Sequence, residues 1–142
     1  MRRVDPESLP RVNEFLADAD LTPASPAAFL WMELDAAGHI VGTTGFELAG
    51  QNALIRSVAV RADLRGTGLG LRFAALACVE AQLAGATTAW LFSRRSGPFW
   101  QKLGFSPAST DELADALADT AQVQLFRETG QLEREVAWRR EL

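Results

Sequence analysis

Three runs of β-favouring, largely hydrophobic residues follow one another closely in the first half of the chain. They are FLWMEL at 29–34, IVGTTGFEL at 40–48 and ALIRSVAV at 53–60. The segments between them, DAAGH and AGQN, carry the Gly, Asp and Asn residues that form tight turns between antiparallel strands. The pattern therefore predicts an antiparallel meander of three strands, and MRRVD at residues 1–5 indicates a short strand before it.

Helical spacing of apolar residues predicts one helix before the meander and one after it. The first helix spans residues 7–20, and its apolar face consists of Leu9, Val12, Phe15, Leu16 and Leu21. The second helix spans residues 69–83 and is ended by Gly85. Its predicted face consists of Leu69, Phe73, Leu76, Ala77, Glu80 and Leu83.

A further apolar run, TTAWLFS at 87–93, follows the second helix. A short run of this kind without polar alternation is typical of a strand that is buried on both faces. A strand, a helix and a strand in succession form a parallel pair with a right-handed crossover. The sequence therefore predicts that strand 53–60 lies beside strand 87–93.

The last third of the chain alternates short predicted helices and strands. GPFWQKLG is expected to form a short helix that ends at Gly104, and FSPAS a short strand. DELADALADTAQ is expected to form a helix capped by Thr110 or Asp111, and QLEREVAWRREL a closing strand. The expected anchors of that strand are Leu132, Val136 and Trp138. Residues 1–142 are thus predicted to form a single mixed α/β domain.

Composition and charge narrow the classes of function. The chain has 142 residues, of which 48% are hydrophobic and 23% charged, as expected for one soluble globular domain. Its 14 basic and 18 acidic residues give a net charge of −4, and without a basic face we expect no nucleic-acid binding. No apolar run follows the basic residues of MRRVDPESLP, and none is long enough to span a bilayer, so we expect a cytoplasmic protein without membrane contact.

Cysteine and histidine are each present once. The single Cys78 excludes an internal disulfide and a cysteine-based metal site, so we expect no metal. His39, in the DAAGH segment between two predicted strands, is expected to be a solvated turn residue. Neither residue is therefore a candidate for the chemistry of the protein.

The Gly-rich segment RGTGLG, residues 65–70, lies between strand 53–60 and the helix that starts at Leu69. The first N–H groups of a helix have no intrahelical acceptor and carry the positive end of the helix dipole, so such a turn can bind phosphate. A flexible turn that needs positive φ angles is the alternative interpretation. The segment is no Walker loop, because it continues as Gly-Leu-Arg without a lysine, and its alternating glycines do not match the dinucleotide fingerprint.

The segment does match the pattern Arg-x-x-Gly-x-Gly, and SVAV stands a few residues before it. Together with FWQKLGF further along, these motifs and their order resemble the GNAT superfamily of acyl-CoA-dependent N-acetyltransferases. The resemblance extends over most of the chain, from the helix at 7–20 to FWQKLGF. It implies a GNAT-like α/β fold, in which an antiparallel meander is followed by a parallel β-α-β unit with splayed central strands.

The resemblance also implies acetyl-CoA as the co-substrate. In the family, the turn holds the pyrophosphate through its backbone amides, and the matching residues are Arg65, Gly66, Thr67, Gly68, Leu69, Gly70 and Leu71. The preceding strand pairs with the pantetheine arm through its backbone, and the matching residues are Val58, Ala59 and Val60. A bulge in that strand and its splay from strand 87–93 would open a slot for the acetyl group. Ser93 flanks the same slot.

A narrower likeness links the chain to the arsenic-resistance-associated acetyltransferases of this superfamily. It rests on GFE at 45–47, on LIRSVAV, on PFWQKLGF and on a following segment of the DELADALADT kind. The final part, QVQLFRETGQLEREVAW, departs from the usual ending of that group.

Acetyl transfer requires a group that takes the amine proton, and a carboxylate beside the slot can do so, often through water. Glu47 is the predicted base, because it matches the glutamate of the subgroup pattern, although a strand carboxylate can equally face solvent. Glu33 is the second candidate, and both are expected in strands next to the cofactor strand. Arg56 either orients an anionic substrate or pairs with a carboxylate. Arg95, with Arg94, either holds the CoA 3′-phosphate or an acidic acceptor, or is solvated.

Trp100 stands where the family often has a tyrosine that protonates the departing thiolate. The chain contains no tyrosine, and an indole N–H can donate a hydrogen bond to sulfur but cannot supply a proton near neutral pH. Packing of the short helix is the alternative role of Trp100. Because the CoA thiol has a pKa near that of cysteine, about 8.5, the thiolate can leave without an acid. Ser93 and Ser96 are positioned to relay a proton through water.

The sequence therefore predicts an N-acetyltransferase that moves the acetyl group of acetyl-CoA to a primary amine by direct attack on the thioester. The acceptor is a small molecule or an amino-acid-like compound. A non-catalytic acyl-CoA-binding module is the alternative, because the tyrosine is absent, and a structural or interaction domain is the third hypothesis. The acceptor pocket is expected to form from the loops at 17–30 and 106–131. Pairing of exposed sheet edges would give a homodimer.

Overall fold

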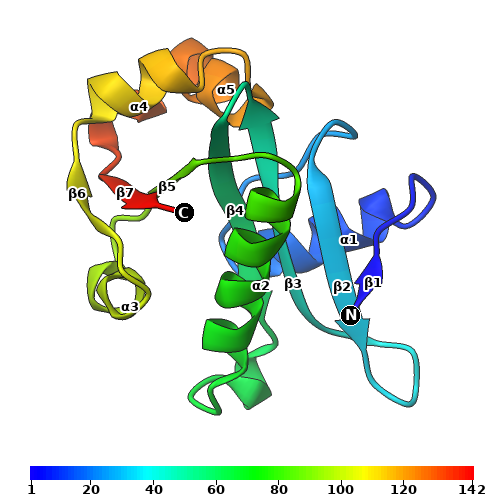
Figure 1. Cartoon of the computed structure of the whole chain (residues 1–142). Coiled ribbons are helices and arrows are strands. Elements are labelled where there is room, and N and C mark those ends of the chain that lie inside the picture. Colours follow the sequence, from blue (N-terminus) through cyan, green and yellow to red (C-terminus); the bar gives the residue numbers. More distant parts are fainter.

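The structure is a computed structural model that describes all 142 residues, and it is built around one mixed sheet of seven strands. The strands lie in the order β1-β2-β3-β4-β5-β7-β6 (Figure 1). Their bounds are Arg2–Arg3 for β1, Phe29–Leu34 for β2, Ile40–Ala49 for β3, Asn52–Val60 for β4, Thr88–Phe92 for β5, Ser106–Ala108 for β6 and Ala137–Glu141 for β7. All strands predicted from the sequence are present.

The meander and the parallel pair are both confirmed. β2, β3 and β4 pair antiparallel, and β4 pairs with β5 in parallel. The parallel pairing covers only three residue pairs, from Asn52 opposite Thr88 to Leu54 opposite Trp90. β4 then continues to Val60 without a hydrogen-bonded neighbour on that side, so the two central strands splay apart as the GNAT-like fold requires.

Two helices cover opposite faces of the meander (Figure 1). α2, Leu69–Leu83, packs on a core with Phe46 and Ile55, whereas α1, Leu9–Asp18, packs on one with Leu30 and Met32. Three shorter helices follow, and they are α3 at Gly97–Lys102, α4 at Thr110–Ala116 and α5 at Ala121–Thr129. None of these helices combines the length and the hydrophobicity needed to cross a bilayer.

The predicted apolar face of α2 is partly wrong. The helix buries Phe73 and, beside it, the small residues Ala74, Ala77, Cys78 and Ala81. Leu83, which was expected on this face, is 76% exposed. The spacing of the large residues misled the prediction, because the side that contacts the sheet consists mainly of alanines that let the helix approach closely.

The predicted helix after residue 110 is in fact two helices, α4 and α5. Ser109, rather than Thr110 or Asp111, caps α4, and its Oγ accepts a hydrogen bond from the Glu112 N–H at 3.2 Å. Thr120 caps α5, and its Oγ1 accepts from the Val123 N–H at 3.4 Å. A second N-cap inside the expected helix therefore starts a new one.

The closing strand begins later than the sequence predicted. Residues Gln131–Arg134 form a short 3₁₀ helix, and β7 starts only at Ala137. Val136 is 42% exposed and does not anchor the strand, while Leu132 is half-buried against the core. Trp138 is buried as expected, and its indole N–H donates to the Ser93 carbonyl at 2.9 Å.

Candidate functional site

A cavity of about 620 Å³ opens between β4 and β5 where the two strands part, and we call it the slot. Residues 55–60 of β4 form one wall, and the end of β5 together with Phe99 and Trp100 of α3 forms the other. The Gly-rich segment at 65–70, the glycine turn, closes one end. The loop after α1 and Gln122 of α5 also contribute to the lining.

A bulge interrupts β4 in the wall of the slot. The register between β3 and β4 shifts by one between Thr43 and Gly45, so one residue of β3 faces two residues of β4, Ser57 and Val58. Ser57 has a φ angle of +62°, and its carbonyl accepts a hydrogen bond from the Thr43 hydroxyl at 2.7 Å. The structure thus contains the bulge that the resemblance implies.

The glycine turn presents unpaired backbone N–H groups at the start of α2. The first hydrogen bond of this helix is from the Arg72 N–H to the Gly68 carbonyl, so the N–H groups at residues 66–71 precede any helical pairing. Gly66 and Gly68 have φ angles of +79° and +87°, which side chains other than glycine rarely adopt. The turn is therefore shaped to hold an anion such as phosphate.

Most of the predicted cofactor residues lie together around the slot. Val58, Ala59, Val60, Arg65, Gly66, Gly68, Gly70, Leu71 and Ser93 all line it. Thr67 and Leu69 do not, and the Thr67 hydroxyl instead donates to the Leu64 carbonyl at 2.6 Å, which fixes the shape of the turn.

Glu47 and Arg56 form a buried ion pair at the wall of the slot, which Arg56 lines and Glu47 does not. Arg56 Nη1 donates to Glu47 Oε2 at 2.9 Å, and the two side chains are 3% and 5% exposed. Glu47 also accepts hydrogen bonds from the backbone N–H groups of Ala121 and Gln122, at 2.8 and 3.3 Å. The carboxylate therefore binds the N-terminus of α5 as well as Arg56.

The other nitrogens of Arg56 bind the loop after α1 and the Ser57 hydroxyl in β4. Its Nη2 donates to the carbonyls of Thr22 and Pro23 at 3.2 and 2.9 Å, and its Nε donates to the Ser57 hydroxyl at 3.1 Å. Gln122 adds a bond from its side-chain amide to the Thr22 hydroxyl at 2.9 Å. Of the two roles that the sequence left open for Arg56, the structure shows the pairing with a carboxylate.

The role of Glu47 as a base stays a prediction. Glu47 does not line the slot, no carboxylate does, and both of its oxygens already accept hydrogen bonds. It does bond to Arg56 and Gln122, which line the slot. A proton could reach the carboxylate only through a water or after rearrangement of the pair.

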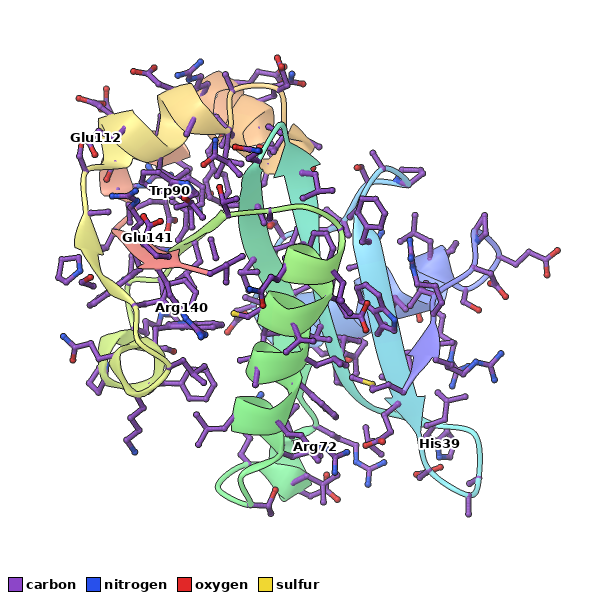
Figure 2. The ribbon with its side chains drawn as sticks, viewed as in Figure 1. His39, Arg72, Trp90, Glu112, Arg140 and Glu141 are labelled. Atoms are coloured by element: carbon purple, nitrogen blue, oxygen red, sulfur yellow. The ribbon has the colours of Figure 1, made fainter.

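Glu33 lies outside the slot. Its strand, β2, is separated from β4 by β3, so the expectation that it neighbours the cofactor strand is wrong. Glu33 instead pairs with Arg72 at 3.0 Å and lies 3.8 Å from the terminal amine of Met1. Figure 2 shows Arg72 at the start of α2 and His39 at the turn between β2 and β3, where its side chain is 76% exposed as expected.

A second cavity of about 410 Å³ adjoins the slot and shares residues with it, including Thr22 and Gln122. Arg95 lines this second cavity rather than the slot, and Arg94 beside it pairs with Glu135 at 3.4 Å. The residues come from the loop after α1, the end of β5 and the segment from α5 onward. About half of this lining comes from the loops at 17–30 and 106–131 that the sequence predicted for an acceptor pocket, and most of the rest comes from the end of β5 and the residues after it.

Trp100 is 8% exposed and packs edge-on against Phe99 and Phe105, with ring centroids 5.0 and 5.5 Å away. It also lines the slot. Its indole N–H donates to no protein acceptor, and no buried side-chain nitrogen or oxygen lacks a partner, so this N–H remains accessible. The packing role considered from the sequence is therefore observed, and donation from the indole N–H to the departing sulfur stays a prediction.

Sequence reasoning missed three residues that shape the site, namely Thr22, Ser57 and Gln122. Thr22 lies in a loop and Gln122 in the first turn of α5, neither in a periodic pattern, so no sequence signal marks them. Ser57 belongs to the SVAV motif, but its positive φ follows from the bulge and is rare for serine.

Comparison with known proteins identifies the family. The model of the acetyltransferase (GNAT) family matches residues 2–105. The chain belongs to this family. GNAT-family enzymes are acyl-CoA-dependent acyltransferases that use acetyl-CoA as co-substrate. No curated protein matches the chain.

Several solved structures share the GNAT fold. N-acetylglutamate synthase from Neisseria gonorrhoeae, complexed with coenzyme A and N-acetyl-glutamate, has a TM-score of 0.79 and 18% identity, over 99% of this chain and 34% of that one. Rv2747 from Mycobacterium tuberculosis, in complex with CoA, has a TM-score of 0.72 and 16% identity, over 99% and 98%. The ribosomal-protein-S18-alanine N-acetyltransferase from Escherichia coli has a TM-score of 0.64 and 19% identity, over 76% and 77%. The chain spans about a third of the length of the synthase.

Proposed function

We propose that this protein is an N-acetyltransferase that moves the acetyl group of acetyl-CoA to a primary amine of a small molecule or an amino-acid-like compound. The observation that carries the proposal is the continuity of the slot with the glycine turn. An anion site at residues 66–71 and an open strand edge at 55–60 border one cavity. Bound CoA and N-acetyl-glutamate in the synthase from Neisseria gonorrhoeae support both the cofactor and the kind of acceptor.

The proposed placement of acetyl-CoA follows the polar groups around the slot. The N–H groups of the glycine turn bind the pyrophosphate, and the guanidinium of Arg65 adds a positive charge beside it. The pantetheine arm extends along the edge of β4 that β5 leaves unpaired, at residues 58–60. The thioester then lies at the bulge, where the splay gives the acceptor access.

In the proposed reaction the neutral amine attacks the thioester carbonyl directly. A carbon–nitrogen bond forms, the carbon–sulfur bond breaks, the amine loses one proton and the CoA thiolate gains one. The backbone N–H of Val58 polarises the carbonyl and stabilises the oxyanion. Trp100 donates a hydrogen bond to the departing sulfur, and the final proton reaches the thiolate through water near Ser93 and Ser96.

The experiment that tests this proposal follows the release of free CoA thiol from acetyl-CoA with a panel of amines, amino acids and aminoacyl analogues. The assay reads only the cofactor, because burial raises the pKa of the Cys78 thiol and keeps the sole protein cysteine neutral and inaccessible. We expect amine-dependent thiol release. Tight acetyl-CoA binding with silence across the whole panel would instead support the alternative, a non-catalytic acyl-CoA-binding module.

Trp100→Tyr should keep acetyl-CoA binding and raise the rate of thiol release by up to about tenfold, because a phenol can protonate the thiolate. Trp100→Phe is the matched control, since it removes the same part of the indole but supplies no hydroxyl. Thiol-release assays on both variants, at acetyl-CoA concentrations that saturate each variant equally, measure the difference between their rates. Equal rates for the two variants would show that an acid at this position does not matter, and loss of binding in both would show that Trp100 holds the slot together.

Glu47→Gln tests the proposed base. If Glu47 takes the amine proton, the variant should bind acetyl-CoA normally but release thiol about 100-fold more slowly. Glu33→Gln, at a carboxylate outside the slot, should leave the rate unchanged. Urea unfolding of both variants checks that they remain folded, because Glu47→Gln removes the charge that pairs with Arg56. A wild-type rate for the folded Glu47→Gln protein would leave Glu47 with only its structural contacts.

The arsenic-resistance likeness adds no acceptor to this proposal. The segment in which the chain departs from that group includes α5, whose N-terminus is bound to Glu47 at the edge of the slot. Residues from this segment also line the second cavity. Part of the proposed acceptor pocket, including Gln122 and Phe126, thus comes from the segment in which the chain departs from that group.

A further inference from the structure

Ser57 has an unusual backbone conformation in the wall of the slot. Its φ of +62° lies in the left-handed region, which only one other non-glycine residue of the chain, Asp20, adopts. Ser57 is buried, with 7% of its surface exposed, and lines the slot beside Val58. A glycine would adopt this conformation without steric cost, so the bulge alone gives no reason for a side chain here.

The hydroxyl of Ser57 is held from one side only. Its Oγ accepts a hydrogen bond from Arg56 Nε at 3.1 Å, and it donates to no protein acceptor. Arg56 cannot turn away, because its other nitrogens bind Glu47 and the carbonyls of the loop after α1. A hydroxyl that accepts from a fixed guanidinium is polarised and becomes a stronger donor through its own proton.

We propose that the Ser57 hydroxyl is a second hydrogen-bond donor to the thioester oxygen, beside the backbone N–H of Val58. This inference rests on the proposed acetyl transfer and adds a side chain to the oxyanion site at the bulge. Ser57 gives up no proton and forms no covalent bond in this role. It stabilises the negative charge that develops on the carbonyl oxygen as the amine attacks. When the intermediate collapses, that electron pair re-forms the C=O bond and the carbon–sulfur pair leaves with the thiolate.

Arg56 has a positioning role in the same arrangement. Four of the five guanidinium N–H groups bind protein acceptors, so we assign Arg56 an action on the substrate through Ser57 rather than by direct contact. It orients the Ser57 hydroxyl and, through Glu47, connects the bulge to the N-terminus of α5. The Glu47–Arg56 ion pair is thus connected to the reacting carbonyl through the Ser57 hydroxyl.

The test compares Ser57→Gly and Ser57→Ala with wild type, using hydroxylamine as the acceptor. Hydroxylamine is small and largely uncharged at neutral pH, so it needs neither an acceptor pocket nor a base, and its rate reports on the thioester carbonyl. Ser57→Gly is the decisive variant, because the φ of +62° suits glycine and the loss of the Arg56 Nε acceptor is its only structural cost. Calorimetry measures acetyl-CoA binding, and thiol release measures the rate.

We expect both variants to bind acetyl-CoA with unchanged affinity and to release thiol about 100-fold more slowly than wild type. A folded Ser57→Gly protein that binds acetyl-CoA and reacts at the wild-type rate would overturn the role of Ser57 while leaving the transferase proposal intact. If the wild type itself binds acetyl-CoA but accelerates neither hydroxylamine nor any amine, the proposed function fails and the role of Ser57 fails with it.

Discussion

Replacing Arg56 with methionine is expected to lower the free energy of unfolding by about 3–5 kcal/mol, because it leaves the Glu47 carboxylate buried without its counter-ion. Glu47 is 4% exposed, so water cannot replace the lost partner in the folded state. The same change frees the carbonyls of Thr22 and Pro23, which Arg56 now holds. Urea denaturation, monitored by tryptophan fluorescence, measures the loss of free energy of unfolding.

Arg72→Met provides the matched control for this prediction. Arg72 pairs with Glu33 at 3.0 Å, a distance close to that of the buried pair, but its side chain is 63% exposed. An exposed pair of this kind contributes no more than about 1 kcal/mol, so the control should unfold near the wild-type midpoint. Equal losses in Arg56→Met and Arg72→Met would contradict the view that burial makes the Glu47–Arg56 pair critical.

Gly68→Glu is expected to weaken acetyl-CoA binding by about 100-fold or more, because it places a carboxylate at the N-terminus of α2 where the pyrophosphate should bind. A Cβ added at Gly68 meets no atom within 4 Å, so the side chain can leave the backbone without a clash. Isothermal titration calorimetry with acetyl-CoA gives the dissociation constants.

Gly38→Glu is the control for the added negative charge and for the strain of a side chain at a positive φ. Gly38 has a φ of +84°, close to the +87° of Gly68, and it too has open space around its Cα. It lies in the turn between β2 and β3, next to the exposed His39 in Figure 2, and does not line the slot. This variant should carry the same strain and charge but bind acetyl-CoA like wild type. Comparable weakening in both variants would remove the glycine turn from the proposed cofactor site.

Local chemistry made much of the fold predictable. The turn segments between strands specify hairpins, and the strand, helix and strand that follow specify a parallel crossover. The apolar face of α2 was less predictable, because alanines at Ala74, Ala77 and Ala81 contribute little hydrophobic signal although they face the sheet. The boundary between α4 and α5 is marked locally only by the Thr120 N-cap, and Glu47, which binds the start of α5, is distant in sequence.

The candidate site, like the fold, was predictable only in part. The glycine turn is recognisable because a helix start and its glycines suffice to make an anion site. The partner of Glu47 could not be derived, since strand alternation gives only the face of the sheet and Arg56 had two plausible roles. Glu33 was misplaced because its residue type was given more weight than the predicted meander, which already separates strand 29–34 from strand 53–60 by one strand. Contacts between segments far apart in sequence therefore decide which polar residues act together.

The most direct test of the central claim is the fate of the acetyl group itself. Wild-type protein and Gly68→Glu would each be incubated with acetyl-CoA labelled with carbon-13 in the acetyl group and with the amine panel, and the products followed by mass spectrometry. We expect wild type to place the label in an N-acetyl amide of at least one amine, and Gly68→Glu not to do so at the same acetyl-CoA concentration. Label that stays in acetyl-CoA or appears only as free acetate would contradict the claim.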